Sequence, residues 1–334
     1  MNSYIKAISY YLPKKILANK DLCNEFPDLI EEEIFKIAGI KYRHISELDE
    51  IGSDVAFFAA ENFFSEHEIK KEEIDFLLFC TEGLDYKAPA TACILQHRLG
   101  LSKKCGTLDI PYGCTGFVYG LSVAKGLIES NQAKNVLLLT SDVPSKVIHP
   151  KDKDLRIIFG DGGAATLISS TTENKKIGNF VFGTDGSGYE NLIVRKSGSR
   201  EFMTNDWLEE YKDSNGMKWG KMEMKSSEIF LFALKVVPPM IRELLEKENT
   251  GIDDIDLFVF HQANTQMLDI IRKKMRIPEE KFIIDMENQG NTVSATIPIA
   301  LKNAMNKGLA KKGDKIMLCG FGIGLSWAGT IVEM

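Results

Sequence analysis

Two segments of the chain recur in the same register about 180 residues later, and this repeat restricts the fold more than any other feature. Residues 72–82, EEIDFLLFCTE, resemble residues 253–263, DDIDLFVFHQA. Residues 135–142, NVLLLTSD, resemble residues 315–322, KIMLCGFG. Self-similarity at a fixed offset indicates a duplicated supersecondary unit. The chain is therefore expected to contain two similar halves.

The halves are expected to be residues 1–172 and 173–334, and each alternates short apolar runs with amphipathic helical patterns. This alternation is typical of sheets covered by helices, so the fold class is α/β. In the first half we expect helices over 53–64 and from 116 to about 130, with a strand over 107–112 and a core strand over 135–142.

The second half is expected to open with a strand over 177–187. Residues 198–222 have no clear period and predict a long excursion, which is either a lid over a cleft or surface decoration. Residues 226–249 predict a helix that Pro238 and Pro239 kink or break.

Charge and composition exclude several classes of protein. The net charge is −6, which provides no general attraction for nucleic acid or an anionic membrane. No apolar run approaches the roughly 18 residues of a membrane span, and the N-terminal residues lack the pattern of a signal peptide, so a cytoplasmic protein is expected. Six cysteines without a CxxC pair predict free thiols and no metal site.

Cys114 is the best candidate for a nucleophile. The segment 109–121, DIPYGCTGFVYGL, places this thiol between Gly113 and Gly116, where a strand turns into a helix. A helix N-terminus favours a thiolate, and the glycines let a substrate carbonyl approach the backbone. From these residues alone, a small buried cysteine in a tight turn remains an equal alternative.

His261 and Asn291 are expected to face the same cleft as Cys114. His261 ends the apolar run DLFVFHQAN, where α/β folds place their sites, and the repeat puts its turn opposite Glu82. Asn291 lies in a glycine-containing turn, 177 residues after Cys114 and close to the repeat register. A structural histidine is the alternative for His261.

Two glycine-rich strings, FGDGGAA at 159–165 and GFGIG at 320–324, fit neither a P-loop nor a dinucleotide fingerprint. The second is expected to bring backbone N–H groups of Phe321, Gly322 and Ile323 close to Cys114, as half of an oxyanion hole.

Taken together, these motifs resemble the ketoacyl-[acyl-carrier-protein] synthase III branch of the thiolase superfamily over nearly the whole chain. The resemblance rests on PATACILQHRLG, YGCTGFVYGL, IIFGDGGAA, HQAN, GNTVSATIP and GFGIGLSWAG, in family order. It implies a thiolase-like, duplicated five-layer αβαβα fold with two pseudo-symmetric halves, a homodimer, and a catalytic set of Cys114, His261 and Asn291. It implies no cofactor and no metal, with acyl thioesters of coenzyme A or acyl carrier protein as substrates.

The implied reaction belongs to fatty acid biosynthesis and has two halves. An acyl group moves to Cys114 while its oxyanion is held by backbone N–H groups of Cys114 and Ile323. A malonyl thioester then loses CO₂ while neutral His261 and Asn291 donate hydrogen bonds to its thioester oxygen, and the enolate attacks the acyl group. Phe321 would crowd the departing carboxylate. The product is a 3-oxoacyl thioester.

Several residues depart from the pattern of members that use acetyl-CoA. Glu33 and Ile37 stand where those members carry a Trp and an Arg that clamp adenine, and Lys153 replaces an Arg. Ala88 replaces a bulky residue, so the acyl pocket is expected to be larger. These departures favour a specialised acyl group delivered by a carrier protein or an unusual thioester, for secondary metabolism or surface glycans.

Glu82 and a basic helix add two further expectations. In the related 3-hydroxy-3-methylglutaryl-CoA synthase branch, a Glu at the position of Glu82 is a general base, which would permit condensation without decarboxylation; a solvated or supporting carboxylate is the alternative. A run of four cations is the candidate surface for docking the acidic carrier protein: Arg272, Lys273, Lys274 and Arg276.

Two other functions stay open from the sequence. One is an acyltransferase that uses the same acyl-Cys114 to acylate an alcohol or amine. The other is a catalytically silent scaffold, against which the intact Cys–His–Asn set argues.

Overall fold

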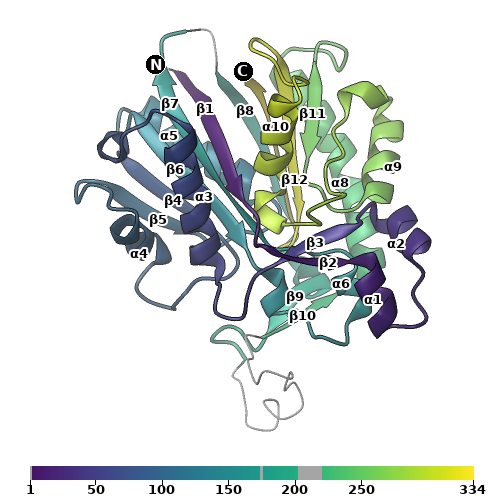
Figure 1. Cartoon of the computed structure of the whole chain (residues 1–334). Helices are drawn as coiled ribbons and strands as arrows, with labels where there is room; N and C mark the ends of the chain where they lie inside the picture. Colours follow the sequence, from purple (N-terminus) through teal and green to yellow (C-terminus); the bar gives the residue numbers. More distant parts are fainter. Residues whose placement is uncertain (1, 174–175, 202–219) are drawn as a thin grey trace.

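The computed structural model describes residues 2–173, 176–201 and 220–334, and it shows two sheets between layers of helices (Figure 1). The first sheet has the strand order β1-β7-β6-β4-β5. Its strands are β1 (Asn2–Tyr11), β7 (Gly162–Thr171), β6 (Asn135–Asp142), β4 (Phe76–Cys80) and β5 (Gly106–Ile110). Strand β7 is antiparallel to β1 and β6, whereas β4 is parallel to β5 and β6.

The second sheet repeats the order of the first four of these strands. Its order is β8-β13-β12-β11, with β8 (Ile177–Thr184), β13 (Ser326–Glu333), β12 (Lys315–Gly322) and β11 (Leu257–Phe260). Strand β13 is antiparallel to β8 and β12, and β11 is parallel to β12. The repeated strand order and directions confirm the duplication. We propose the boundary at 172/173, which lies between β7 and β8.

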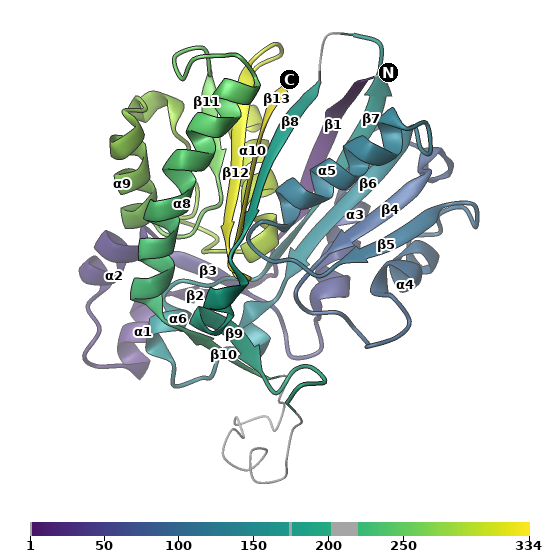
Figure 2. The same ribbon diagram turned by 180° about the vertical axis from the view of Figure 1, so that it is seen from behind.

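Buried apolar side chains define five layers, as Figure 2 also shows from behind. Helices α3 (Gly52–Glu66) and α4 (Thr91–Arg98) cover one face of the first sheet. Helices α5 (Gly116–Glu129) and α10 (Thr296–Asn306) lie between the sheets. Helices α8 (Ser226–Lys247) and α9 (Thr265–Met275) cover the outer face of the second sheet.

Shorter elements complete the described chain. A small sheet pairs β2 (Lys15–Ala18) with β3 (Tyr42–Ile45), and another pairs β9 (Leu192–Arg195) with β10 (Lys221–Met224). The short helices are α1 (Asn19–Glu25), α2 (Glu31–Ala38) and α6 (Lys153–Arg156). The 3₁₀ turns are η1 (Lys71–Glu73), η2 (Pro144–Lys146), η3 (Gly186–Asn191), η4 (Glu279–Lys281) and η5 (Val293–Ala295).

The expected helices at α3 and α5, and the strands at β5, β6 and β8, are confirmed to within a few residues. Of the kink or break expected at Pro238 and Pro239, the break is wrong, because α8 runs continuously through both. Each proline removes a helical hydrogen bond, but burial of Val237 and Ile241 against the second sheet holds this stretch in place.

The expected excursion over 198–222 is wrong at its end, because β10 begins at Lys221 and pairs with β9. The lid expected there falls mostly on 202–219, which lie outside the described residues. Within the described ranges, no helix is long and apolar enough to cross a membrane. The same ranges contain no group of three or more His, Cys, Asp or Glu side chains that could hold a metal ion.

Candidate active site

Cys114 lies in the turn between β5 and α5, two residues before the helix begins, and is 6% exposed. The end of β12 packs directly against it. A Cβ atom on Gly322 would lie 2.9 Å from the Cys114 Sγ, and the φ of Gly322 is 157°, so this position requires glycine. A Cβ atom on Gly320 would lie 2.8 Å from the Cα of Thr115. The glycines of β12 therefore allow close approach to the thiol.

The expected stabilisation of a Cys114 thiolate is wrong for the free protein. Burial raises the pKa of the Cys114 thiol to about 12, and the nearby carboxyl of Glu82 adds to the increase. Backbone N–H groups of Ile323 and of Cys114 itself point toward the sulfur and act in the opposite direction on this pKa. Because desolvation outweighs these donors, the thiol is protonated at neutral pH and must lose its proton during a reaction.

His261 follows β11, and its position is fixed from two sides. Its backbone N–H donates to the Cys319 carbonyl at 2.7 Å, which continues the pairing with β12. Its Nδ1 lies 2.7 Å from the Oγ1 of Thr296, at the start of α10. Burial lowers the pKa of His261 to about 3, so the ring is neutral over the physiological range.

The side chain of Asn291 contacts the turn that carries His261. Its Nδ2 donates to the Ala263 carbonyl at 3.4 Å, and its Oδ1 accepts from the Val293 N–H at 2.9 Å. Its backbone N–H donates to Ile158, and its carbonyl accepts from the Gly160 N–H, both at 3.0 Å. The glycine-rich string at 159–165 thus packs against the segment that holds Asn291.

Consecutive residues at the end of β12 bring these groups together. The Phe321 ring contacts the His261 ring edge-to-face, with centroids 5.7 Å apart, while Gly322 contacts Cys114. Cys114, Val293 and Ile323 also belong to one apolar cluster. A thiol, a neutral imidazole and a carboxamide therefore converge where both halves meet, which suits acyl transfer to sulfur and stabilisation of a developing oxyanion.

Glu82 lies beside this site. A Cβ atom on Gly113 would lie 2.9 Å from its Oε1. The Glu82 residue is exposed, whereas desolvation of its carboxyl group and the charge of Asp142 raise the pKa of that group above its usual value. The sequence analysis did not single out Asp142. The repeat could have drawn attention to it, because Asp142 ends β6 at the position equivalent to Gly322, which ends β12.

The basic run is only partly available at the surface. The guanidinium of Arg272 donates to Asp269 and to the Ile277 carbonyl, and its side chain is only 14% exposed. Lys273 pairs with Asp269 at 2.6 Å but remains 67% exposed, and Lys274 and Arg276 are exposed. The exposed basic surface on and just after α9 therefore consists of Lys273, Lys274 and Arg276.

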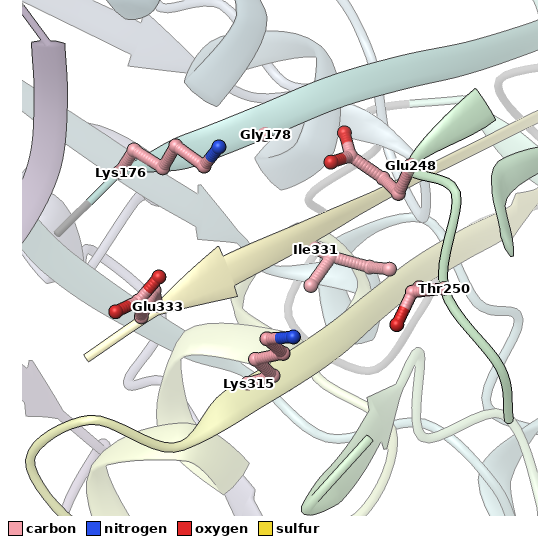
Figure 3. Close-up of a pocket in the computed structure, with 7 residues that line it drawn as sticks. All are labelled: Lys176, Gly178, Glu248, Thr250, Lys315, Ile331 and Glu333. Atoms are coloured by element: carbon pink, nitrogen blue, oxygen red, sulfur yellow. The ribbon is translucent and has the colours of Figure 1, made fainter. Parts of the chain in front are cut away.

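A separate pocket of about 240 Å³ lies far from Cys114 (Figure 3). It includes Lys315 at the start of β12, whereas Gly322 at the other end of that strand contacts Cys114. Figure 3 shows the charged side chains of Lys176, Glu248 and Glu333 around it. This pocket does not belong to the candidate active site.

Comparisons with known proteins agree with this arrangement. Residues 108–186 match the family model described as 3-oxoacyl-[acyl-carrier-protein (ACP)] synthase III, and residues 245–334 match its C-terminal model. The chain is 37% identical over 333 residues to beta-ketoacyl-[acyl-carrier-protein] synthase III of Clostridium perfringens, covering 100% of this chain and 99% of that protein.

Solved structures show the same fold. A 3-oxoacyl-(acyl-carrier-protein) synthase III matches with a TM-score of 0.96 and 43% identity over 100% of both chains. Beta-ketoacyl-[acyl carrier protein] synthase III from Thermus thermophilus matches with a TM-score of 0.89 and 33% identity over 99% of both chains. These similarities confirm the duplicated five-layer fold.

Proposed function

The chain belongs to the 3-oxoacyl-[acyl-carrier-protein] synthase III family of acyl-transferring condensing enzymes, and on this basis we propose that Cys114, His261 and Asn291 carry out its reaction. The observation that carries the proposal is the position of the end of β12. Phe321 contacts His261 there, and the next residue, Gly322, contacts Cys114.

In the first half-reaction, the Cys114 sulfur attacks the carbonyl of an acyl thioester. The bond from that carbonyl to the carrier sulfur breaks, and the Cys114 proton goes to the departing thiolate. The N–H groups of Cys114 and Ile323 are aimed at the reacting sulfur and can hold the oxyanion that forms beside it. Because the thiol pKa is about 12 before substrate binds, proton removal and attack are expected to be coupled.

In the second half-reaction, a malonyl thioester loses CO₂, and the electron pair of the broken bond forms an enolate. The enolate carbon attacks the acyl group, the bond to Cys114 Sγ breaks, and the 3-oxoacyl thioester leaves while the Cys114 thiolate takes up a proton from water. Thr296 engages Nδ1 of His261, so the Nε2 edge of the ring is the one that meets the thioester oxygen, together with Asn291. Phe321 crowds the carboxylate that leaves.

The wild-type protein provides the direct test of this function. Incubation with an acyl thioester should add the acyl mass to Cys114, and addition of malonyl carrier protein should release a 3-oxoacyl product of matching mass. Mass spectrometry of the intact protein and of the product measures both steps. Acylation of an alcohol or amine without any malonyl donor would instead support an acyltransferase.

We further propose that the acyl group arrives on a carrier protein. The residues that replace the adenine clamp of acetyl-CoA-using relatives offer little to adenine: Glu33 and Ile37 are exposed on α2, and Lys153 is paired with Asp28. Loss of an aromatic stack and an Arg contact removes about 1 kcal/mol and about 1.5–3 kcal/mol, respectively. Together this is on the order of a hundredfold in affinity for coenzyme A.

The exposed basic surface of α9 should dock an acidic carrier. Reversing two of its charges with Lys273→Glu and Lys274→Glu should slow carrier-dependent loading of Cys114 by about tenfold at low salt, because charge complementarity mainly raises the association rate. Loading from the matching acyl-CoA should change little, and the effect should shrink at higher ionic strength. Stopped reactions analysed by intact-protein mass spectrometry measure both rates.

The pair Lys311 and Lys312 provides a matched control. Both are exposed and lie in the segment between α10 and β12 rather than on α9. Reversing these two charges should leave carrier-dependent loading unchanged. Equal slowing by both double variants would show that net charge, rather than a docking surface on α9, controls the rate.

We also propose that the active protein is a homodimer. Strand β5 is the edge strand of the first sheet, and no described strand pairs with its outer edge. An unpaired edge is a template for pairing with another chain. Leu108 on this strand is 44% exposed, and nearby Tyr86 is 62% exposed, which are the apolar contacts that a second copy would cover.

A further inference from the structure

Asp142 connects the two halves of the chain, and the proposed reaction gives its side chain no role. It ends β6, is 4% exposed, and forms no ion pair with any described residue. Its Oδ1 accepts from the Glu82 N–H at 2.8 Å and from the Thr81 hydroxyl at 3.4 Å. Its Oδ2 accepts from the backbone N–H of Ser294 at 3.1 Å and from the Ser294 hydroxyl.

Ser294 lies in the middle of the turn that holds the proposed donors to the malonyl thioester. The Val293 N–H donates to Asn291 Oδ1 at 2.9 Å, and the Thr296 Oγ1 lies 3.0 Å from the Val293 carbonyl oxygen. Thr296 in turn contacts His261 Nδ1 at 2.7 Å. Asn291 and His261 are therefore both connected to the residue that precedes Ser294.

The backbone of this turn needs an external restraint. Val293 has a φ of 54°, which is a rare and unfavourable conformation for a β-branched residue. Such conformations cost about 1–3 kcal/mol and persist only where the surroundings enforce them. The two hydrogen bonds from Ser294 to the Asp142 carboxylate act on the very next residue, and they are charge-assisted and buried.

We propose that Asp142 is a positioning residue for the condensation step, and that its carboxylate holds the turn over 291–296 so that Asn291 and His261 meet the malonyl thioester together. The inference rests on the proposed function. The decarboxylating half-reaction needs the Asp142 carboxylate, whereas acyl transfer to Cys114 does not. Val293 of this turn packs in the same apolar cluster as Cys114, but the backbone N–H groups near the Cys114 sulfur come from Cys114 itself and Ile323, outside the turn.

The charge of Asp142 supports this separation between the two half-reactions. Asp142 is among the carboxyls that raise the pKa of Cys114, so its removal should not make the thiol harder to ionise. Asp142→Asn keeps the size of the side chain but replaces one acceptor oxygen with an NH₂ donor. An asparagine can satisfy the donors of Glu82 or those of Ser294, but not both pairs.

The experiment measures both half-reactions in Asp142→Asn, in Ser294→Ala and in the double variant. Loading of Cys114 should stay within about threefold of wild type in Asp142→Asn, while product formation falls about a hundredfold, the loss typical of a misplacement near 1 Å. Ser294→Ala keeps its backbone bond to Asp142 and should lose about tenfold in product formation. The double variant should be no slower than Asp142→Asn, because both changes break one restraint.

Asp109→Asn is the control. Asp109 accepts two hydrogen bonds, from the backbone N–H groups of Thr91 and Ala92 at the start of α4, and neither residue lies on the 291–296 turn. It should lose comparable thermal stability with a much smaller loss of product formation. The Asp142 proposal would be overturned by near-normal product formation in Asp142→Asn, by equal losses in both half-reactions, or by multiplicative losses in the double variant.

The design separates failure of this inference from failure of the proposed function. If wild-type protein neither loads an acyl group nor makes a 3-oxoacyl product, the proposed function is wrong. If wild type performs both steps, the variants test Asp142 alone. Should Asp142→Asn not fold, Ser294→Ala decides the question, and near-normal product formation in that variant contradicts the proposal.

Discussion

Replacement of Cys114 with alanine is expected to abolish the acyl-enzyme while leaving the protein folded. The sulfur is the only protein atom in the proposed mechanism that bonds to the acyl group, so no covalent adduct should form with any acyl thioester. The packing cost should be small, on the order of 1 kcal/mol, because the change removes one buried atom. Intact-protein mass spectrometry measures the adduct, and thermal unfolding measures the stability.

Cys93 provides the control for this experiment. It is an exposed thiol on α4, remote from the turn that carries Cys114. Cys93→Ala should load its acyl group at the wild-type rate. A covalent acyl adduct that persists in Cys114→Ala would show that another residue is the acceptor.

Loss of His261 or Asn291 is expected to separate the two half-reactions. His261→Ala and Asn291→Ala should each lower formation of the 3-oxoacyl product by about 10²–10³, the usual effect of removing a donor to a developing oxyanion. Loading of Cys114 should remain within about tenfold of wild type, because the N–H groups near its sulfur come from Cys114 and Ile323. Single-turnover loading and steady-state product formation measure the two effects.

Both substitutions truncate buried side chains, so the thermal stability of each variant must be measured as well. His261 is 2% exposed and Asn291 is 4% exposed, and each change leaves a cavity. Rates are compared only for variants whose midpoint of thermal unfolding lies above the assay temperature. If such folded variants also fail to load Cys114, then His261 and Asn291 act in acyl transfer, and the division between the half-reactions is wrong.

The repeat in the sequence was sufficient to predict the duplicated fold. Core strands must be apolar, and β4, β6, β11 and β12 are buried on both faces, so their sequences stayed similar enough to align. Residues 72–82 and 253–263 contain β4 and β11, and the second pair of segments became β6 and β12. The same alignment correctly placed Cys114 and Asn291 at turns that precede α5 and α10.

Local chemistry was predicted less well, because it depends on burial. The sequence shows a helix start after Cys114, which favours a thiolate, but it does not show that protein surrounds the thiol and raises its pKa to about 12. The basic run was similarly visible as four cations, whereas only the fold shows that the Arg272 side chain is just 14% exposed. Both differences arise from neighbours distant in the sequence or from the depth of the site.

The sequence by itself determined the two-sheet architecture and singled out the candidate thiol, imidazole and carboxamide, because periodicity and side-chain chemistry are local properties of the chain. Only the tertiary structure decided which contacts hold these three groups in place. The contact between Gly322 and Cys114 and the bonds from Asp142 to Glu82 and Ser294 join residues more than 50 positions apart. Such contacts follow from how the two sheets pack around α5 and α10, which no local pattern records.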